Sequence, residues 1–272
     1  MSSKKKEDLK EIAKKIRRDI ILSTAEAGSG HIMSSLSTVE ILVSLYYDVM
    51  NHYPEDPKSP DRDRFVLSKG HAAPALYSVM AETGYFPVEE LKSLRKIESR
   101  LQGHPVSHRL PGLDSSSGSL AQGISISVGM AIAGKLDNKS YRVYALLGDG
   151  ECQEGEVWEA AMSAAHFNLD NLIAIIDMNG LQSDGKTDDI MSLGSLKNKW
   201  ESFGWKVFEV NGHDFNSLLD AFKNAKSIKG QPTVIIAKTI KGAGVSFIEG
   251  NLKYHSAPLN KDELALALEE LR

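Results

Sequence analysis

Residues 146–151 have the sequence Leu-Leu-Gly-Asp-Gly-Glu, and residues 175–180 have the sequence Ile-Ile-Asp-Met-Asn-Gly. Each stretch is a short apolar run that ends in polar residues and a turn, which is typical of a buried parallel strand. A segment long enough for a helix separates the two stretches. The pattern therefore predicts neighbouring strands that bring Asp149 and Asn179 side by side at one edge of a sheet.

These two side chains suggest a metal and phosphate site. A carboxylate and an amide oxygen form half of a shell for Mg²⁺ or Ca²⁺, leaving positions for phosphate oxygens and water. The glycines at 148 and 150 would let a diphosphate approach the backbone. Residues 118–123 (Gly-Ser-Leu-Ala-Gln-Gly) are predicted to open a helix whose free N–H groups favour phosphate, although glycine before a helix is common.

Composition excludes several classes of protein. The 272 residues are 42% hydrophobic and 25% charged, so residues 1–272 are expected to form one domain with an N-terminal helical arm, although two small domains are possible. A net charge of −4 gives no sign of the positive charge that is typical of nucleic-acid-binding proteins. No apolar run approaches the ~18 residues of a membrane span. We interpret the lysines at 4–6 as a solvated helix start, and the single Cys152 as a packing residue in a reducing, cytoplasmic setting.

Strand and helix signals alternate along the chain. Strands are predicted at 64–68, 141–147, 172–178, 206–210 and 233–240. Helices are predicted at 5–27, 38–50, 72–83, 119–135, 154–167, 193–203, 215–227 and 261–271, with loops at 51–64 and 100–118. This order predicts an α/β fold, a three-layer, doubly wound, mostly parallel sheet with helices on both faces. Ligands bind at the carboxyl ends of the strands in such sheets.

Four histidines lie beside glycines or small-residue turns: His31, His71, His104 and His255. Their long spacings and the lack of supporting cysteines disfavour a zinc site. Polar contacts to an anionic, hydroxylated substrate fit these residues better.

Acidic and basic residues flank the predicted site. The helix dipole explains Glu151 and Glu156, while Glu154 and Glu159 lie on approximately one side of the helix and could face the site or a subunit contact. Either Lys238 or Lys241, at the end of the last strand, could reach a diphosphate, the alternative being an exposed lysine.

Together these stretches resemble the N-terminal domain of transketolase, which binds the diphosphate of thiamine diphosphate. The signature from Gly148 to Asn179 is shared by many thiamine-diphosphate enzymes. The resemblance to transketolase covers essentially the whole chain and lies in residues 28–31, 68–71, 103–105, 118–123, 150–155 and 241–245, followed by His255. Departures are Ala121, where the family often has glycine, and residues 32–34, which differ from the Pro- or Gly-containing stretch often seen there.

The resemblance implies roles for individual residues. Mg²⁺ (or Ca²⁺) would be held by Asp149, Asn179 and the Leu181 carbonyl. His31, His104 and His255 would contact the sugar and move protons. Glu154 would also serve catalysis. Together with Glu159, it would lie at a subunit interface that links two active sites. Thiamine diphosphate would be bound by Ser34, His71, Gly118, Ser119, Leu120, Gly148, Asp149, Gly150, Glu151, Asn179, Lys241 and His255.

The resemblance also implies a partner. Single-chain transketolases continue into a pyrimidine-binding domain and a C-terminal domain, which carry the glutamate that contacts the pyrimidine and most of the arginines that grip the sugar phosphate. This chain stops at Arg272. We therefore expect the N-terminal subunit of a split transketolase, active only with a C-terminal subunit in a heterotetramer of two plus two chains. It would transfer a two-carbon ketol unit between sugar phosphates, as in the pentose phosphate pathway.

Alternative functions remain open. The chain could belong to a deoxyxylulose-phosphate synthase-like or keto-acid dehydrogenase-like enzyme, which an assay with pyruvate against xylulose 5-phosphate would decide. It could serve a transketolase for an unusual sugar, be a non-catalytic cofactor-binding module, or be a fragment of a longer enzyme.

Overall fold

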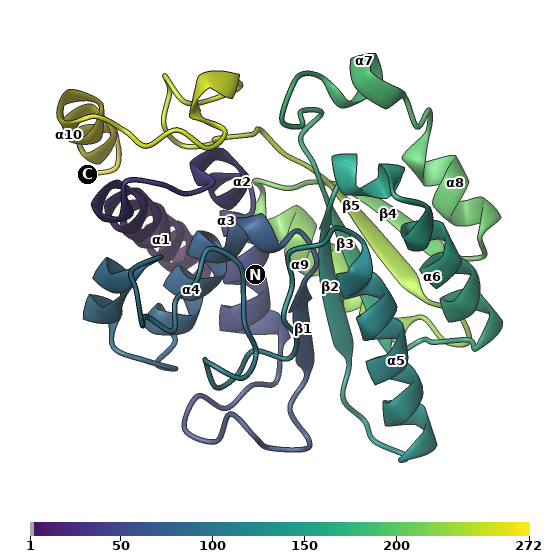
Figure 1. The fold of residues 1–272 in the computed structure, drawn as a ribbon. Coiled ribbons are helices and arrows are strands. Elements are labelled where there is room, and N and C mark those ends of the chain that lie inside the picture. Colours follow the sequence, from purple (N-terminus) through teal and green to yellow (C-terminus); the bar gives the residue numbers. More distant parts are fainter. Residues whose placement is uncertain (1–2) are drawn as a thin grey trace.

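A central parallel sheet organises the fold. The computed structural model describes residues 3–272, with side chains from residue 7 onward, so the predicted solvation of the lysines at 4–6 lies outside the described side chains. The strands are β1 (Arg64–Leu67), β2 (Val143–Gly148), β3 (Leu172–Met178), β4 (Lys206–Asn211) and β5 (Thr233–Lys238). They lie in the order β1-β2-β3-β5-β4, and each pairing is parallel (Figure 1). The predicted fold class is confirmed.

The central strands are buried on both faces, which is why their sequences are nearly continuous runs of apolar residues. Along β2, Tyr144 and Leu146 join the core on one side of the sheet, and Ala145 and Leu147 join the core on the other side. This alternation follows from the two-residue period of a strand.

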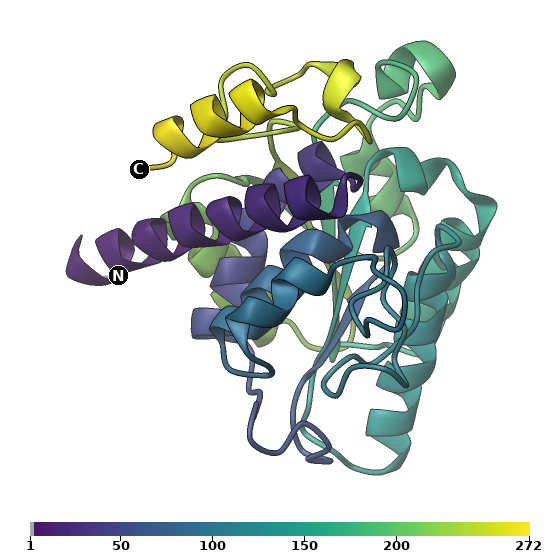
Figure 2. The ribbon, with the colours of Figure 1, turned by 60° about the vertical axis from the view of Figure 1, so that its left-hand side comes forward.

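Helices cover both faces of the sheet (Figure 1). One layer contains α1 (Ser3–Ala27), α2 (Ile32–Leu36), α3 (Val39–Ser44), α4 (Ala73–Glu82) and α9 (Phe215–Ser227), and the other contains α5 (Gln122–Leu136), α6 (Gly155–His166) and α8 (Leu196–Ser202). The helix α10 (Lys261–Glu270) lies along α1 (Figure 2). The short helix α7 (Thr187–Met191) lies in the segment after β3. No described helix is long and apolar enough to cross a membrane.

Several boundaries differ from the sequence predictions. The helix predicted at 119–135 begins at Gln122, because Ala121 has a left-handed φ of 70° and forms a turn. The helix predicted at 38–50 is preceded by α2 and ends in a π-helical turn at Leu45–Val49. The helix predicted at 193–203 begins at Leu196, where the Ser195 hydroxyl accepts a hydrogen bond from the Asn198 N–H and caps the helix.

Shorter helical turns complete the connections. The 3₁₀ turns cover Gly70–Ala72, Val88–Ser93, Gly150–Gln153 and Leu252–Tyr254. Two of them directly follow β1 and β2, so they set the direction in which the chain leaves the carboxyl edge of the sheet. This edge holds the candidate site.

Candidate active site

A cavity of about 360 Å³ opens at the carboxyl edge of the sheet. All the predicted site residues line it except Ser119 and Glu154. Three further residues, which the sequence did not single out, also line it: Lys69, Gln182 and Ser183. Its walls thus come from chain segments that are far apart in the sequence.

Asp149 and Asn179 lie side by side, as predicted. Their strands are neighbours, with Gly148 paired to Asp177 across β2 and β3. The Asp149 carboxylate accepts hydrogen bonds from the N–H groups of Gly150, at 2.9 Å, and Gly180, at 2.6 Å. Burial and the nearby Asp177 raise the pKa of Asp149, and these two N–H donors oppose that rise.

A fully buried ion pair between Lys69 and Asp177 contacts the side chain of Asn179. Lys69 Nζ lies 2.5 Å from Asp177 Oδ2, and both residues are buried. Asp177 also accepts hydrogen bonds from Ser37 Oγ at 2.7 Å, from Thr239 Oγ1, and from Asn179 Nδ2 at 3.1 Å. Burial acts to raise the pKa of Asp177, but Lys69, Thr239 and Ser37 hold it below its usual value. Because Nδ2 donates to Asp177, the amide of Asn179 is fixed in one orientation.

The donor set fits a hard divalent cation. Asp149 offers a carboxylate, Asn179 an amide oxygen and Leu181 a backbone carbonyl, all oxygen ligands of the kind that Mg²⁺ and Ca²⁺ prefer. The Leu181 carbonyl accepts a hydrogen bond from Lys241 Nζ at 2.9 Å, so a positive charge already lies against it. Within residues 7–272, no group of three His, Cys, Asp or Glu side chains is placed to hold a metal.

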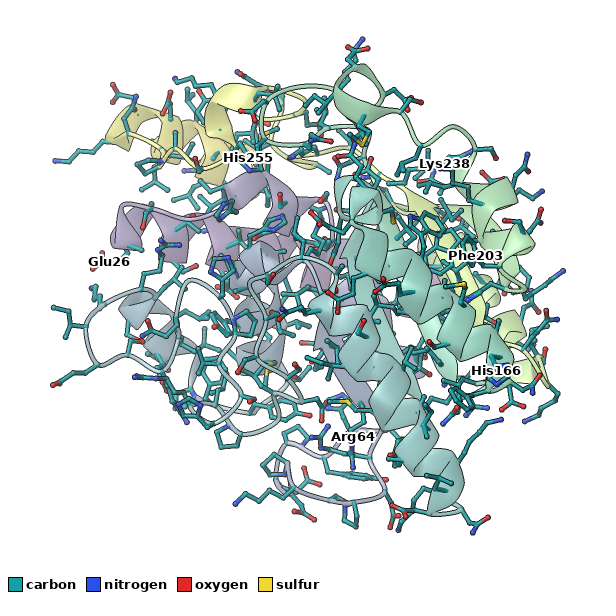
Figure 3. All side chains as sticks on the ribbon, turned by 45° about the vertical axis from the view of Figure 1, so that its right-hand side comes forward. Glu26, Arg64, His166, Phe203, Lys238 and His255 are labelled. Atoms are coloured by element: carbon teal, nitrogen blue, oxygen red, sulfur yellow. The ribbon has the colours of Figure 1, made fainter. Side chains whose placement is uncertain are left out.

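The four predicted histidines gather around the cavity. The ring centroid of His31 lies 5.2 Å from His71, 6.4 Å from His104 and 5.3 Å from His255. His255 comes from the segment between β5 and α10 (Figure 3). Each neighbour comes from a different loop, so the cluster exists only in the folded chain.

These imidazoles have depressed pKa values. Burial, with help from His255 and His104, lowers the pKa of His31 to about 4. Burial is also the main reason why the pKa values of His71, His104 and His255 lie below the usual value. The Nδ1 atoms of His31 and His255 are buried and hydrogen-bond to no described residue. Neutral imidazole rings can bind and exchange protons with hydroxyl groups.

The two candidate lysines differ. Lys241 is buried and lines the cavity, and burial, followed by the charge of Lys69, lowers the pKa of its ammonium to about 8. Lys238 is exposed and pairs with Glu209 at 3.3 Å, away from the cavity (Figure 3). Of these two lysines, only Lys241 therefore lines the cavity.

Glu151 joins three segments that line the cavity. Its buried carboxylate accepts hydrogen bonds from Ser68 Oγ at 2.5 Å, from the Ala121 N–H at 2.8 Å and from the Gly148 N–H at 3.0 Å. These bonds, rather than the helix-dipole effect inferred from the sequence, explain an acid at this position. Burial raises the pKa of Glu151, and the three donors act against that rise.

Other predicted residues lie outside the cavity. Glu154 precedes α6, and both it and Glu159 are exposed, as is Ser119. The roles suggested for Glu154 and Glu159 at a subunit contact stay predictions. Cys152 is buried with its Sγ 3.5 Å from the Gly148 carbonyl, as expected of a packing residue, and burial raises the pKa of its thiol.

Comparisons with known proteins agree with this arrangement. A family described as "Transketolase, thiamine diphosphate binding domain" matches residues 9–271. A subunit of the apulose-4-phosphate transketolase of Actinobacillus succinogenes is 45% identical, over 98% of this chain and 96% of that protein. The 6-deoxy-6-sulfo-D-fructose transketolase subunit SqwG of a Clostridium species is 43% identical, over 97% of this chain and 96% of that protein.

Longer relatives match over part of their length. Human transketolase is 45% identical, over 97% of this chain and 42% of the human protein. The transketolase structure from Campylobacter jejuni superposes with a TM-score of 0.92 at 34% identity, over 97% of this chain and 43% of that chain. The chain thus spans nearly the full length of the two named subunits and about two fifths of these longer transketolases.

Proposed function

The chain belongs to the transketolase thiamine diphosphate binding domain family, and from that premise we propose that it is the N-terminal subunit of a transketolase. It would transfer a two-carbon ketol unit between sugar phosphates together with a separate subunit that carries the pyrimidine-binding domain. One observation carries the proposal: the Asp149 and Asn179 oxygens, the Leu181 carbonyl and four histidines line a single cavity.

The residues divide the work of binding. Asp149, Asn179 and the Leu181 carbonyl would hold Mg²⁺, with Lys241, His71, Ser34 and Gly118 around the diphosphate. Thiamine diphosphate supplies a thiazolium carbon that can accept and release a two-carbon unit. Neutral imidazoles act as bases, so His31 and His255, which line the cavity, would accept hydroxyl protons of the sugar.

A second subunit is part of the proposal. Relatives that are named as transketolase subunits align with this chain over nearly their whole length, which supports a companion chain. The adjacent helices α5 and α6 expose Ile126, Leu136 and Met162, apolar side chains that suit a protein contact. Glu154 and Glu159 lie on the same part of the chain. We infer a heterotetramer of two plus two chains.

The relatives also point to the class of substrate. Their names specify apulose 4-phosphate and 6-deoxy-6-sulfofructose, which are sugars with a phosphate or sulfonate group. We infer that this chain likewise serves a sugar with an anionic terminal group, in the cytoplasm. The pentose phosphates are included among the candidates.

Reconstitution tests the proposed function. The chain is combined with the companion protein, Mg²⁺ and thiamine diphosphate, and each is also assayed alone. The donors are xylulose 5-phosphate, apulose 4-phosphate, 6-deoxy-6-sulfofructose and pyruvate, each offered with an aldose phosphate as the acceptor. We expect ketol transfer from at least one sugar, only when both chains are present, and none with the Asp149→Asn variant.

The other outcomes each contradict part of the proposal. Full activity of the isolated chain would rule out dependence on a partner. Turnover of pyruvate would indicate a deoxyxylulose-phosphate synthase-like or keto-acid dehydrogenase-like enzyme. Cofactor binding without any turnover of the complex would identify a non-catalytic module.

A further inference from the structure

The segment Ile240–Gly244, which carries Lys241, is held from outside the cavity by Arg17, Glu40 and His213. None of these three side chains lines the candidate active site. They come from α1, α3 and the turn after β4, and they meet at the backbone on both sides of Lys241. We call them the Arg17–Glu40–His213 set.

His213 binds the segment at its beginning. The Ile240 N–H donates to His213 Nε2 at 2.8 Å, and His213 Nδ1 lies 3.0 Å from Glu40 Oε2. Since Nε2 accepts a hydrogen bond, the proton of a neutral ring is on Nδ1 and is donated to the carboxylate. One tautomer of His213 therefore links the backbone N–H of Ile240, the residue before Lys241, to the carboxylate of Glu40.

Arg17 binds the same segment at its end. Its Nε donates to the Ala243 carbonyl at 2.9 Å, and its Nη2 lies 2.8 Å from Glu40 Oε1. Gly244 has a φ of +94°, and a Cβ at this position would lie 2.5 Å from Arg17 Nε. A side chain there would push the guanidinium away, so the glycine allows this close contact.

Glu40 is the common partner of both contacts. Arg17 and Glu40 are buried, and a buried carboxylate is tolerated when it is paired and hydrogen-bonded. Burial acts to raise the pKa of Glu40, but Arg17 and His213 hold it below its usual value. The charged group therefore stays in place and fixes both ends of the short segment.

We propose that Arg17, Glu40 and His213 are positioning residues that hold Lys241 where it binds the cofactor diphosphate. The inference rests on the proposed function. Its physical basis is preorganisation: the flexible side chain of Lys241 starts from a backbone that is fixed at residues 240 and 243, so less freedom is lost on binding.

Three variants separate positioning from general stabilisation. His213→Leu removes both hydrogen bonds of the ring. His213→Gln can keep both, because an amide oxygen can accept from the Ile240 N–H while the amide nitrogen donates to Glu40. The matched control is Asp114→Asn, which disturbs another buried ion pair, with Arg62 at 2.6 Å, where Asp114 also accepts from the Phe65 N–H near the amino end of β1.

The measurement is the Kd of thiamine diphosphate at saturating Mg²⁺, by calorimetry on the chain with its companion subunit. We expect His213→Leu to weaken binding by about 10- to 100-fold, the range typical of residues that orient a binding group. His213→Gln should stay near wild type. Asp114→Asn should lower Tm without changing Kd. Glu40→Gln, which keeps the side-chain volume, should weaken binding in the same direction and serves if His213→Leu does not fold.

Hydrogen exchange gives an independent readout. The Ile240 amide of the unliganded chain should exchange faster in His213→Leu than in wild type or Asp114→Asn. Normal cofactor binding by His213→Leu and Glu40→Gln, or equal losses in His213→Leu and Asp114→Asn, would overturn this inference alone. A wild-type complex that does not bind thiamine diphosphate would overturn the proposed function as well.

Discussion

Lys69 and Asp177 form a charged pair in the most buried part of the sheet, below the predicted metal ligands. Placing charges there is unfavourable unless each has partners, and Asp177 has four: Lys69, Ser37, Thr239 and Asn179. The pair therefore fixes the orientation of Asn179.

Breaking this pair on one side should destabilise the chain strongly. Asp177→Asn leaves the Lys69 ammonium buried without its counter-charge, so we expect a loss of about 3–5 kcal/mol in the free energy of unfolding, measured with urea. The double variant Asp177→Asn with Lys69→Met should lose less than Asp177→Asn alone. Losses that simply add would show that the two charges are not coupled.

Asp149 should control metal-dependent binding of the cofactor. Asp149→Ala removes the only carboxylate among the three predicted ligands, so we expect the Kd of thiamine diphosphate with Mg²⁺ to rise at least about 100-fold, beyond the range found for residues that only support a ligand. Calorimetry with and without Mg²⁺ measures the effect. Asp56→Ala, at an exposed aspartate in the loop before β1, is the control, and an unchanged affinity in Asp149→Ala would contradict the metal assignment.

The sequence predicted the residues that lie at strand ends and in glycine turns, but not the residues that support them. Asp149 and Asn179 follow apolar runs, so the position of their side chains could be inferred from strand order. Lys69 lies within the Ser-Lys-Gly-His stretch, yet only the fold shows that it reaches Asp177. The charge of Asp177 inside an apolar run was the available signal, because such a charge needs a buried partner.

Helix α5 packs closely against the end of β1 at a glycine. A Cβ on Gly123 would lie 2.6 Å from Ser68 Cα, whereas a Cβ on Gly129, in the same helix, would meet nothing within 4 Å. We expect Gly123→Ala to lose about 1–3 kcal/mol by forcing α5 away from the strand. Gly129→Ala should be neutral or stabilising by up to about 1 kcal/mol. Thermal and urea unfolding compare them, and equal effects would refute the close packing.

The contact between α1 and α4 contains a carboxyl pair that should respond to pH. Burial and Glu82 raise the pKa of Asp19 to about 7, and Asp19 Oδ2 is buried without a partner among the described residues. The folded chain keeps this proton while the unfolded chain releases it near pH 4. The stability that protonated Asp19 contributes to the folded chain is therefore fully present below about pH 4, and it is lost as the pH rises through about 7.

Asp19→Asn should remove this dependence. The difference in Tm between the variant and wild type should shift in favour of the variant by roughly 2–4 °C from pH 5 to pH 8. A free-energy change of about 1 kcal/mol produces a shift of this size in a chain of this length. Asp61→Asn, in an exposed pair with Lys139, should show no such trend. A constant difference between Asp19→Asn and wild type at all pH values would contradict the shifted pKa.

Elements with strong local signals were predicted best. The bounds of β3 and α9 agree with the predictions, because β3 is a continuous apolar run and Asp214 caps α9 by accepting from the Ser217 N–H. The start of α5 was missed because the left-handed turn at Ala121 is stabilised from a distance, where the Ala121 N–H donates to Glu151. The short helices α2 and α7 were missed because local sequence gave them no clear boundaries.

At the scale of the whole molecule, the exposed apolar side chains of α5 and α6 should mediate assembly. Met162 is 55% exposed on α6, and a charge there would be buried in a contact with the companion subunit. We expect Met162→Lys to weaken assembly by about 10-fold, equivalent to about 1.4 kcal/mol, measured by analytical ultracentrifugation. Leu266→Lys, on α10 at the other side of the molecule, should assemble normally (Figure 1). Normal assembly of Met162→Lys would exclude this face.

The cavity takes its walls from residues between His31 and His255, and Arg17 reaches across the chain to Ala243. A ribosome makes the chain from its N-terminus, so the cavity cannot close until His255 has emerged. The nascent chain must therefore build its sheet without help from the cofactor. The unliganded protein is therefore the form that cellular quality control meets first.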